Sequence, residues 1–313
     1  MQTTMRYKMK TKPLRIERFL NEMDQVVPWK QLEKVIQPHY KNTGGRPPHE
    51  LRVMLRIHFL QLWHNLSDPL MEEALYDRLS FQTFLGFDCF GGVIPDESSI
   101  CRFRHLLEEH GLSQQILDAV NAHLDSHGLV LKAGTIVDAT LLAAPVSKQN
   151  TRKERDPEMS STRKNNQWHF GAKGHIGVQA QGQPIIHSTK FTTAKVHDSQ
   201  VLEELQHGKE QALFGDSAYA KQADKRQART DGFYYGISDR GYRKHPLSSS
   251  QKKRHRRHSG IRAKVEHPFR VIKHLWGHRK LRYKGLVKNA AQFTRLCALS
   301  NVFFCRRDLL RAT

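Results

Sequence analysis

The segment Gly134-Thr135-Ile136-Val137-Asp138-Ala139-Thr140 places a single carboxylate inside an apolar run. A run rich in β-branched residues predicts a buried strand. An ionised carboxylate on such a strand is costly unless it is paired or holds a cation. Asp138 is therefore the first candidate for a metal ligand.

The residues around and after this strand predict a mixed α/β sheet. The first strand is expected over residues 129–140, and four more are predicted at 168–178, 184–191, 211–216 and 233–238. A polar loop at 147–167 joins the first two strands, and helices at 198–207 and 217–229 precede and follow the fourth. Three consecutive strands followed by helix–strand alternation predict a mixed five-stranded sheet flanked by helices, of the ribonuclease-H kind.

The second predicted strand alternates between an apolar face and a polar face. Lys173 and His175 lie on the polar face, which is the period-two pattern of a half-buried strand. Both are candidates for facing an active site, and Lys173 for contacting DNA; a solvent-facing strand edge is the competing interpretation. Asp198, a little further on, is interpreted as a helix cap.

A second aspartate repeats the pattern of Asp138. Asp216 closes the apolar segment Leu213-Phe214-Gly215 at the carboxyl end of a predicted strand. Open sheets gather their ligands at that end. Capping of the next helix is the alternative role for a single aspartate in this position. Two such aspartates in one sheet favour a shared site.

Glu266 completes a set of three carboxylates. It lies in a predicted helix over residues 260–276, on one stripe with Arg262, Arg270 and Lys273. A surface ladder of salt bridges is the alternative interpretation of that stripe. Pro268 is expected either to bend this helix or to begin it, because proline disrupts a helix interior.

Three carboxylates on separate elements next to basic residues are typical of two-metal phosphoryl transfer. Such sites hold two divalent cations about 3.5–4 Å apart. One cation activates water or a 3′-hydroxyl group, and the other stabilises the leaving oxygen. Mg²⁺ is the expected ion because it binds few protein carboxylates and keeps positions open for phosphate oxygens; Mn²⁺ is its expected substitute.

The charge of the chain is concentrated in one region. The formal net charge is +21, and residues 221–284 contain 20 basic and 4 acidic residues. The strongest run consists of Lys252, Lys253, Arg254, His255, Arg256 and Arg257. A patch of this kind suits a polyphosphate partner, because neutralised phosphates release their counterions. A solvated basic loop is the alternative, so the charge alone decides nothing.

The first 127 residues predict an all-helical domain. Apolar residues recur at helical spacing from Leu51 to Trp63, and Asp96 is expected to begin another helix. Helices at about 70–79 and 96–109 could form a helix-turn-helix that reads DNA, but the segment between them is longer than the usual turn. An ordinary helical bundle is the alternative. The predicted domains are therefore 1–127, for DNA-end binding or dimerisation, and 128–313, for catalysis with a basic C-terminal region.

The remaining composition gives no indication of a metal-binding cysteine motif or of a membrane protein. The four cysteines, Cys89, Cys101, Cys297 and Cys305, include no Cys-x-x-Cys pair and are expected to be reduced thiols packed in helices. No apolar run approaches the roughly 18 residues of a membrane helix, and no secretory signal is recognisable. A cytoplasmic protein is expected.

Several motifs resemble one known family. They are Ile94-Pro95-Asp96-Glu97-Ser98-Ser99-Ile100, Trp168-His169-Phe170-Gly171-Ala172-Lys173, Val196-His197-Asp198, Gly215-Asp216 and Val265-Glu266-His267-Pro268-Phe269-Arg270-Val271-Ile272-Lys273. Together they resemble the bacterial insertion-sequence-five transposases, within the insertion-sequence-four group, over about residues 45–304. One position departs from the wider group: a tyrosine expected three residues before Arg262 is Ser259 here.

The resemblance implies a DDE transposase with a ribonuclease-H-like catalytic domain. Asp138, Asp216 and Glu266 would hold the metal ions, and Arg262 and Lys273 would contact phosphates of the transposon end. The implied partners are double-stranded DNA, both transposon ends and target, and a second copy of the chain in a homodimer or higher oligomer. No membrane and no small-molecule substrate is expected, and the bacterial protein would be nucleoid-associated when bound to DNA.

Two other functions compete with this one. The first is a catalytically silent DNA-binding protein or repressor derived from a transposase. The second is a nuclease or resolvase of the ribonuclease-H type that cleaves DNA without joining it. The intact carboxylate set argues against the first, and only a joining assay separates the second from a transposase.

Overall fold

The computed structural model describes residues 12–40, 47–87, 93–148, 154–164, 166–242 and 246–312. The chain divides into two compact units. One contains residues 1–120 and 305–313, and the other contains residues 121–304. The predicted domain boundary at residue 127 stays a prediction. Cys89 lies outside the described residues; Cys101, Cys297 and Cys305 are free thiols, as predicted.

The first unit is helical, which confirms the prediction of an N-terminal helical region. Its helices are α2 (Arg15–Val26), α3 (Trp29–Ile36), α4 (Leu51–His64), α5 (Asp68–Asp77), α6 (Leu79–Leu85), α7 (Glu97–Glu109) and the first part of α8 (Leu112–Ser126). Asp96 begins α7 by accepting a hydrogen bond from the Ser99 amide at 2.7 Å. Arg104 of α7 is buried and pairs with Asp68 at 2.8 Å, so it is a structural residue of this unit.

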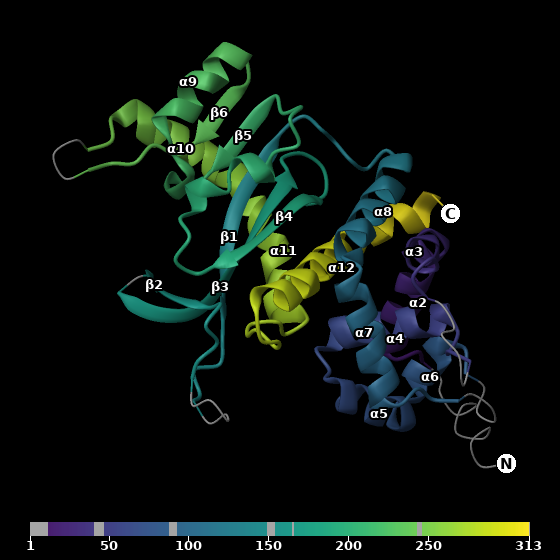
Figure 1. Cartoon of the computed structure of the whole chain (residues 1–313). Coiled ribbons are helices and arrows are strands. Elements are labelled where there is room, and N and C mark those ends of the chain that lie inside the picture. Colours follow the sequence, from purple (N-terminus) through teal and green to yellow (C-terminus); the bar gives the residue numbers. More distant parts are fainter. Residues whose placement is uncertain are drawn as a thin grey trace. The chain divides into compact units, whose positions relative to one another are not determined.

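The second unit is built on a six-stranded mixed sheet (Figure 1). Its strands are β1 (Thr135–Ala143), β2 (Ser160–Lys164), β3 (Gln167–Gln179), β4 (Ile186–Thr193), β5 (Ala212–Gly215) and β6 (Tyr234–Ile237). β3 pairs antiparallel with β1, β2 and β4, whereas β1 with β5 and β5 with β6 are parallel. The strand order is β2–β3–β1–β5–β6, with β4 also paired to β3, and the mixed sheet confirms the predicted fold class.

The sheet has one strand more than predicted, because β2 lies inside the segment 147–167 that was predicted to be a loop. Its sequence, Ser-Ser-Thr-Arg-Lys, has no apolar alternation, and its side chains are exposed or half-buried. The strand exists because it pairs with the start of β3 across a turn in which Asn166 has a positive φ of 62°. Hydrophobic periodicity detects strands that bury a face, so it misses one held by pairing alone.

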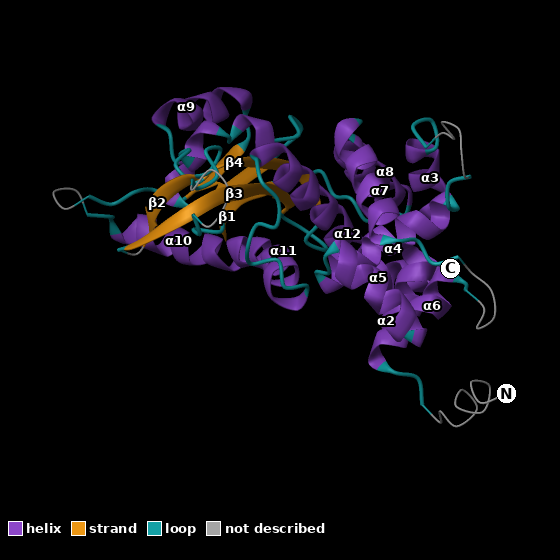
Figure 2. Cartoon of the chain, turned by 60° about the horizontal axis from the view of Figure 1, so that its bottom comes forward, coloured by secondary structure: helices purple, strands orange, loops and turns teal. Residues whose placement is uncertain are grey.

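The two faces of the sheet are covered by different elements. Asp138 is paired with Ile176 across β1 and β3, so it shares a face with the even-numbered residues of β3. On that face the Phe293 ring of α12 (Leu286–Ala312) occupies the space beside Gly174, where a Cβ atom would approach it to 2.5 Å. On the same face, α10 (Ser249–Arg262) covers Phe214 of β5. The ring of His258 in α10 lies 5.4 Å from the ring of Phe214. Figure 2 shows α10 and α11 (Glu266–Arg270) along one side of the strands.

The opposite face carries a compact apolar core. Val137, Leu213 and Ile237 of three adjacent strands pack there with Tyr219 and with the segment from Val201 to Leu205. That segment was predicted as one helix over 198–207. It forms two short 3₁₀ turns instead, η1 (Asp198–Gln200) and η2 (Glu203–Leu205). His197 caps η1 by accepting a hydrogen bond from Ser199, so the predicted cap role of Asp198 is wrong.

Candidate active site

Asp138 and Asp216 lie level with each other on neighbouring strands. The parallel register of β1 and β5 pairs Thr135 with Leu213 and Ile136 with Phe214. Continued by two residues, this register brings Asp138 beside Asp216, which directly follows β5. Paired positions of adjacent strands point to the same face, so the two carboxylates face the same side of the sheet.

Each of the two aspartates uses one carboxylate oxygen to accept a hydrogen bond from a backbone amide one or two residues further along the chain. Oδ1 of Asp138 accepts from the Ala139 amide at 2.8 Å, and Oδ1 of Asp216 accepts from the Ala218 amide at 2.8 Å. Over the described part of the chain, the Oδ2 atoms accept no hydrogen bond and no ion pair is formed. Asp216 therefore does cap the turn η3 (Ser217–Tyr219), yet it keeps one oxygen open.

The surroundings of Asp138 favour its protonated form. Burial raises the pKa of Asp138 to about 6, against the lowering effect of the Ala139 hydrogen bond. The negative charge of Asp216 raises it further, and the charges of Arg262 and Lys164 act in the opposite direction. Two partly buried carboxylates with open oxygens and mutual repulsion are a donor set that fits a hard divalent cation.

Glu266 is carried past β1 by a helical segment that is fixed at two points. Nζ of Lys264 donates to the carbonyl oxygens of Ala180 at 2.8 Å and Gly182 at 3.1 Å, beyond the end of β3 that pairs with the start of β1. Nζ of Lys273 donates to Oγ1 of Thr140 and to the carbonyl oxygen of Leu141, both at 3.0 Å. Because Asp138 lies between these two levels of β1, the segment brings Glu266 to the same part of the sheet.

The Glu266 side chain is exposed and forms no ion pair with Arg262 or Arg270. The alternative of a surface salt-bridge ladder is therefore not what the structure shows. In the described part of the chain, no three His, Cys, Asp or Glu side chains are grouped closely enough to hold a metal. The structure brings Asp138 and Asp216 together, and it does not bring Glu266 into a ligand cluster with them.

The helix around Glu266 departs from α-helical geometry on both sides. Before Glu266 comes a 3₁₀ turn, η4 (Ala263–Val265), and after Arg270 comes a π-helical segment, η5 (Val271–Leu275). Pro268 has no amide hydrogen and its ring would clash with the carbonyl four residues earlier, which accounts for the change at η4. The disruption expected at Pro268 is therefore seen as the 3₁₀ turn η4. Single π-helical turns of this kind are frequent at functional sites.

The basic run on α10 has an inner face and an outer face. Asp239 accepts a hydrogen bond from Lys225 at 3.0 Å and pairs with Arg254, which holds α10 to the preceding segment. Nε2 of His255 accepts from the Asp239 amide at 2.9 Å. Of the five predicted DNA-binding cations in this run, Arg254 is thus engaged within the protein. The other four are exposed: Lys252, Lys253, Arg256 and Arg257.

Lys173 and His175 lie on the face opposite to Asp138. Their partners across the strands are Leu141 and Ala139. Nζ of Lys173 donates to Asp198 at 2.8 Å, and His175 is fully buried with Nε2 at 2.9 Å from Oγ1 of Thr192. Neither the predicted approach to the active site nor the solvent-facing edge describes these residues. They form a buried polar cluster that joins β3 to η1.

Two residues near the aspartates were not identified from the sequence. Lys164 is the last residue of β2 and lies close enough for its charge to act on Asp138. Nothing in the sequence pointed to it, because β2 was expected to be a loop. Tyr219 was missed as well: it is fully buried in the core beside Val137, three residues after Asp216. An aromatic residue in the turn after Asp216 was the available signal.

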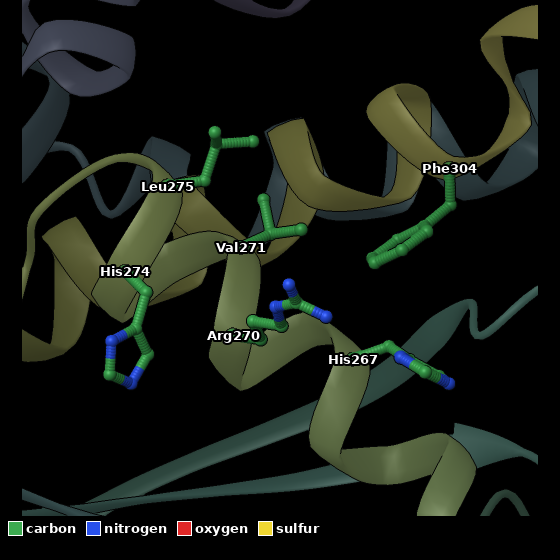
Figure 3. Close-up of a pocket in the computed structure, with 6 residues that line it drawn as sticks. All are labelled: His267, Arg270, Val271, His274, Leu275 and Phe304. Carbon is green, nitrogen blue, oxygen red and sulfur yellow. The ribbon is translucent and has the colours of Figure 1, made fainter.

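A cavity of about 420 Å³ opens one residue beyond Glu266. Figure 3 shows Arg270 at its centre, with His267 and His274 on either side. Val271, Leu275 and Phe304 complete the lining. Its polar side chains are an arginine and two histidines, so it offers no carboxylate to a metal and does not extend the Asp138–Asp216 site.

Two regions of the chain match known protein families. Residues 131–302, more than half of the chain, match the family described as Transposase DDE domain. Residues 10–106 match the family described as Transposase domain (DUF772). The chain belongs to the DDE transposase family. Its catalytic domain is accordingly ribonuclease-H-like, as the strand order indicates, and DNA is its class of substrate.

Within the described ranges, no helix combines the length and the apolar character needed to cross a bilayer.

Proposed function

We propose that this chain is the transposase of a bacterial insertion sequence of the insertion-sequence-five type, and that it cuts and rejoins DNA at the terminal inverted repeats of its element. The observation that carries the proposal is the level placement of Asp138 and Asp216 on adjacent parallel strands. The family match gives this pair its chemical meaning, because DDE enzymes use carboxylates to hold divalent metal ions.

Asp138, Asp216 and Glu266 are proposed as the metal ligands, with Mg²⁺ as the resident ion and Mn²⁺ as substitute. Two bound cations would supply an activated hydroxyl nucleophile and a stabilised leaving oxygen. The open Oδ2 atoms of the two aspartates support their part in this set. Glu266 is exposed on a segment interrupted by η4 and η5, and DNA binding is expected to bring its carboxylate toward the aspartates.

The cations around the carboxylates are proposed to hold the DNA. Arg262 and Lys164 already act on Asp138 through their charges, so a phosphate placed there would be attracted to the same point. Lys273 is bound to β1, where it fixes the segment that carries Glu266. Arg270 and the outer cations of α10 are free to contact phosphates on either side of the cleaved bond.

Two transposon ends must be brought together for strand transfer, so a homodimer or higher oligomer is proposed for the DNA complex. The helical unit that matches the second transposase family is proposed as the part that binds the ends. Specific binding of an end by residues 128–313 alone would contradict that assignment.

The decisive experiment is cleavage of a supercoiled plasmid that carries the two ends of the element, with Mg²⁺ and with EDTA. We expect nicking at the end boundary with Mg²⁺ and none with EDTA. The variants Asp138→Asn, Asp216→Asn and Glu266→Gln should each lose nicking by at least about a thousandfold, as expected for loss of groups acting as one unit. Glu203→Gln, which changes an exposed carboxylate of η2, is the matched control and should cleave normally.

The competing functions give different results in the same assay. Tight end binding without nicking under any metal would indicate a DNA-binding protein or repressor. Metal-dependent nicking without joined products, when pre-cleaved ends and a target plasmid are supplied, would indicate a nuclease. Persistent nicking in one of the three carboxylate variants would remove that residue from the site.

A further inference from the structure

The outer face of α10 is a continuous cationic surface. Lys252 and Lys253 occupy one turn and Arg256 and Arg257 the next, and all four are exposed. The helix sequence contains no acidic residue, so these charges are not neutralised along the helix. The two pairs of cations are one turn, roughly 5.4 Å, apart along the axis. A face with this charge and repeat is complementary to a row of backbone phosphates.

Gly260 continues this face one turn further. It follows Arg256 at the i+4 position and is exposed. A Cβ atom built on Gly260 would have no neighbouring atom within 4 Å. Its φ is not positive, so the helix does not require glycine there for its conformation.

The glycine is therefore unfavourable for the free protein. Glycine is the weakest helix former after proline, and alanine would fit here without any contact. A glycine on a helix surface allows another molecule to approach the backbone closely. Within the described structure no other segment lies beside Gly260, so its surface is open to a binding partner.

We propose that the sugar–phosphate backbone of duplex DNA crosses α10 at Gly260, with its neighbouring phosphates bound by Arg256, Arg257 and the lysine pair. This inference rests on the proposed function, since it names the surface on which the substrate lies. Contacts of this type are independent of base sequence. The same surface would therefore bind any duplex, including target DNA.

The main alternative is that Gly260 lets the helical run bend before η4. The two explanations differ in their link to Arg256. If DNA lies on Gly260, a methyl group there lifts the phosphate away from Arg256, so the two positions act together. If Gly260 only permits bending, its effect on binding should be the same with or without the arginine.

The test measures binding of a fluorescent duplex of arbitrary sequence by anisotropy, together with the thermal midpoint of the free protein. Gly260→Ala should raise the midpoint, because it favours the helix, and should weaken DNA binding by about tenfold. In an Arg256→Gln background the same alanine should weaken binding by about twofold or less. Ser259→Ala is the matched control, because it changes the adjacent exposed residue without adding a Cβ atom, and it should leave affinity unchanged.

Two results would overturn the proposal. One is a stabilised Gly260→Ala protein that binds the duplex as tightly as the original chain. The other is an equal loss of affinity in both backgrounds. Neither result depends on catalysis, so plasmid cleavage by the unmodified protein decides the proposed function separately.

Discussion

Asp138 and Asp216 carry like charges at one level of the sheet, and the structure supplies no direct cationic partner for either. No ion pair reaches these two carboxylates in the described residues, although Arg262 and Lys164 act on Asp138 from a distance. Such a pair is stabilised by a proton or by a metal ion, and the two compete for the same oxygens. The protonation of Asp138 therefore sets how much Mg²⁺ the site requires.

We predict that the Mg²⁺ concentration for half-maximal cleavage is constant well above pH 6 and rises about tenfold per pH unit below it. The reason is that burial raises the pKa of Asp138 to about 6, so below that pH the proton must leave before the metal binds. Magnesium titrations of plasmid nicking between about pH 8 and about pH 5 measure this, with circular dichroism as a check on folding. A magnesium requirement that stays flat down to about pH 5 would contradict the combination of a raised Asp138 pKa and metal binding by its carboxylate.

The carboxylates themselves were predictable from sequence, since an aspartate in or after an apolar strand is costly without a partner. A shared site for Asp138 and Asp216 was expected because both lay in one predicted sheet, whereas their level register on parallel strands is seen only in the structure. The partners of Lys173 and Arg104 were not predictable. Each pairs with an aspartate far along the chain, so only the tertiary structure shows that its charge is already used.

At the scale of elements, apolar periodicity correctly predicted the strands that form the core. It did not predict elements that depend on strand pairing or on tertiary packing. β2 is held by pairing to β3. The segment 198–207 forms 3₁₀ turns because its apolar residues pack directly on the sheet core. The interruption η4 before Glu266 likewise follows from Pro268, which a periodicity of 3.6 residues does not describe.

The two faces of α10 lead to a prediction about its arginines. Arg256→Gln combined with Arg257→Gln should weaken binding of a generic duplex and reduce the slope of log affinity against log salt by about 2. Both side chains are exposed, and each is expected to neutralise about one phosphate. Arg254→Gln should leave the slope unchanged and lower the stability of the protein, because Arg254 pairs with Asp239.

Anisotropy titrations over a range of salt concentrations give the slope, and urea unfolding gives the stability. A salt slope for the double variant equal to that of the original chain would mean that Arg256 and Arg257 do not bind phosphates. The comparison is matched, because all three changes replace arginine by glutamine within one helix.

At the scale of the whole molecule, both compact units contain histidines that are largely removed from water. His64 is half-buried in the helical unit; in the sheet unit, His175 is buried and His187 is half-buried. Burial lowers the pKa of His64 and of His175 to about 4 and that of His187 to about 3. Unfolding would expose all three to water, where histidine takes up a proton near pH 6.5.

We therefore predict that the free energy of unfolding is highest above about pH 6.5 and falls as the pH drops from 6.5 toward 4. In this window the unfolded chain binds more protons than the folded chain, so each histidine contributes a loss of up to about 1.4 kcal/mol per pH unit. Below its pKa of about 6, Asp138 contributes to the free energy of unfolding with the opposite sign, because the folded protein binds its proton more readily than the unfolded chain. This single contribution opposes those of three histidines. The net slope remains destabilising in acid.

Urea unfolding at a series of pH values measures this slope, and His187→Gln identifies one contributor. His187 accepts or donates a hydrogen bond with Oγ1 of Thr135 at 3.1 Å, which glutamine can also do. The variant should lose stability less steeply between about pH 6.5 and about pH 4, whereas His197→Gln, at an exposed position, should keep the original slope. An identical slope in His187→Gln would contradict the lowered pKa of His187 in the folded protein.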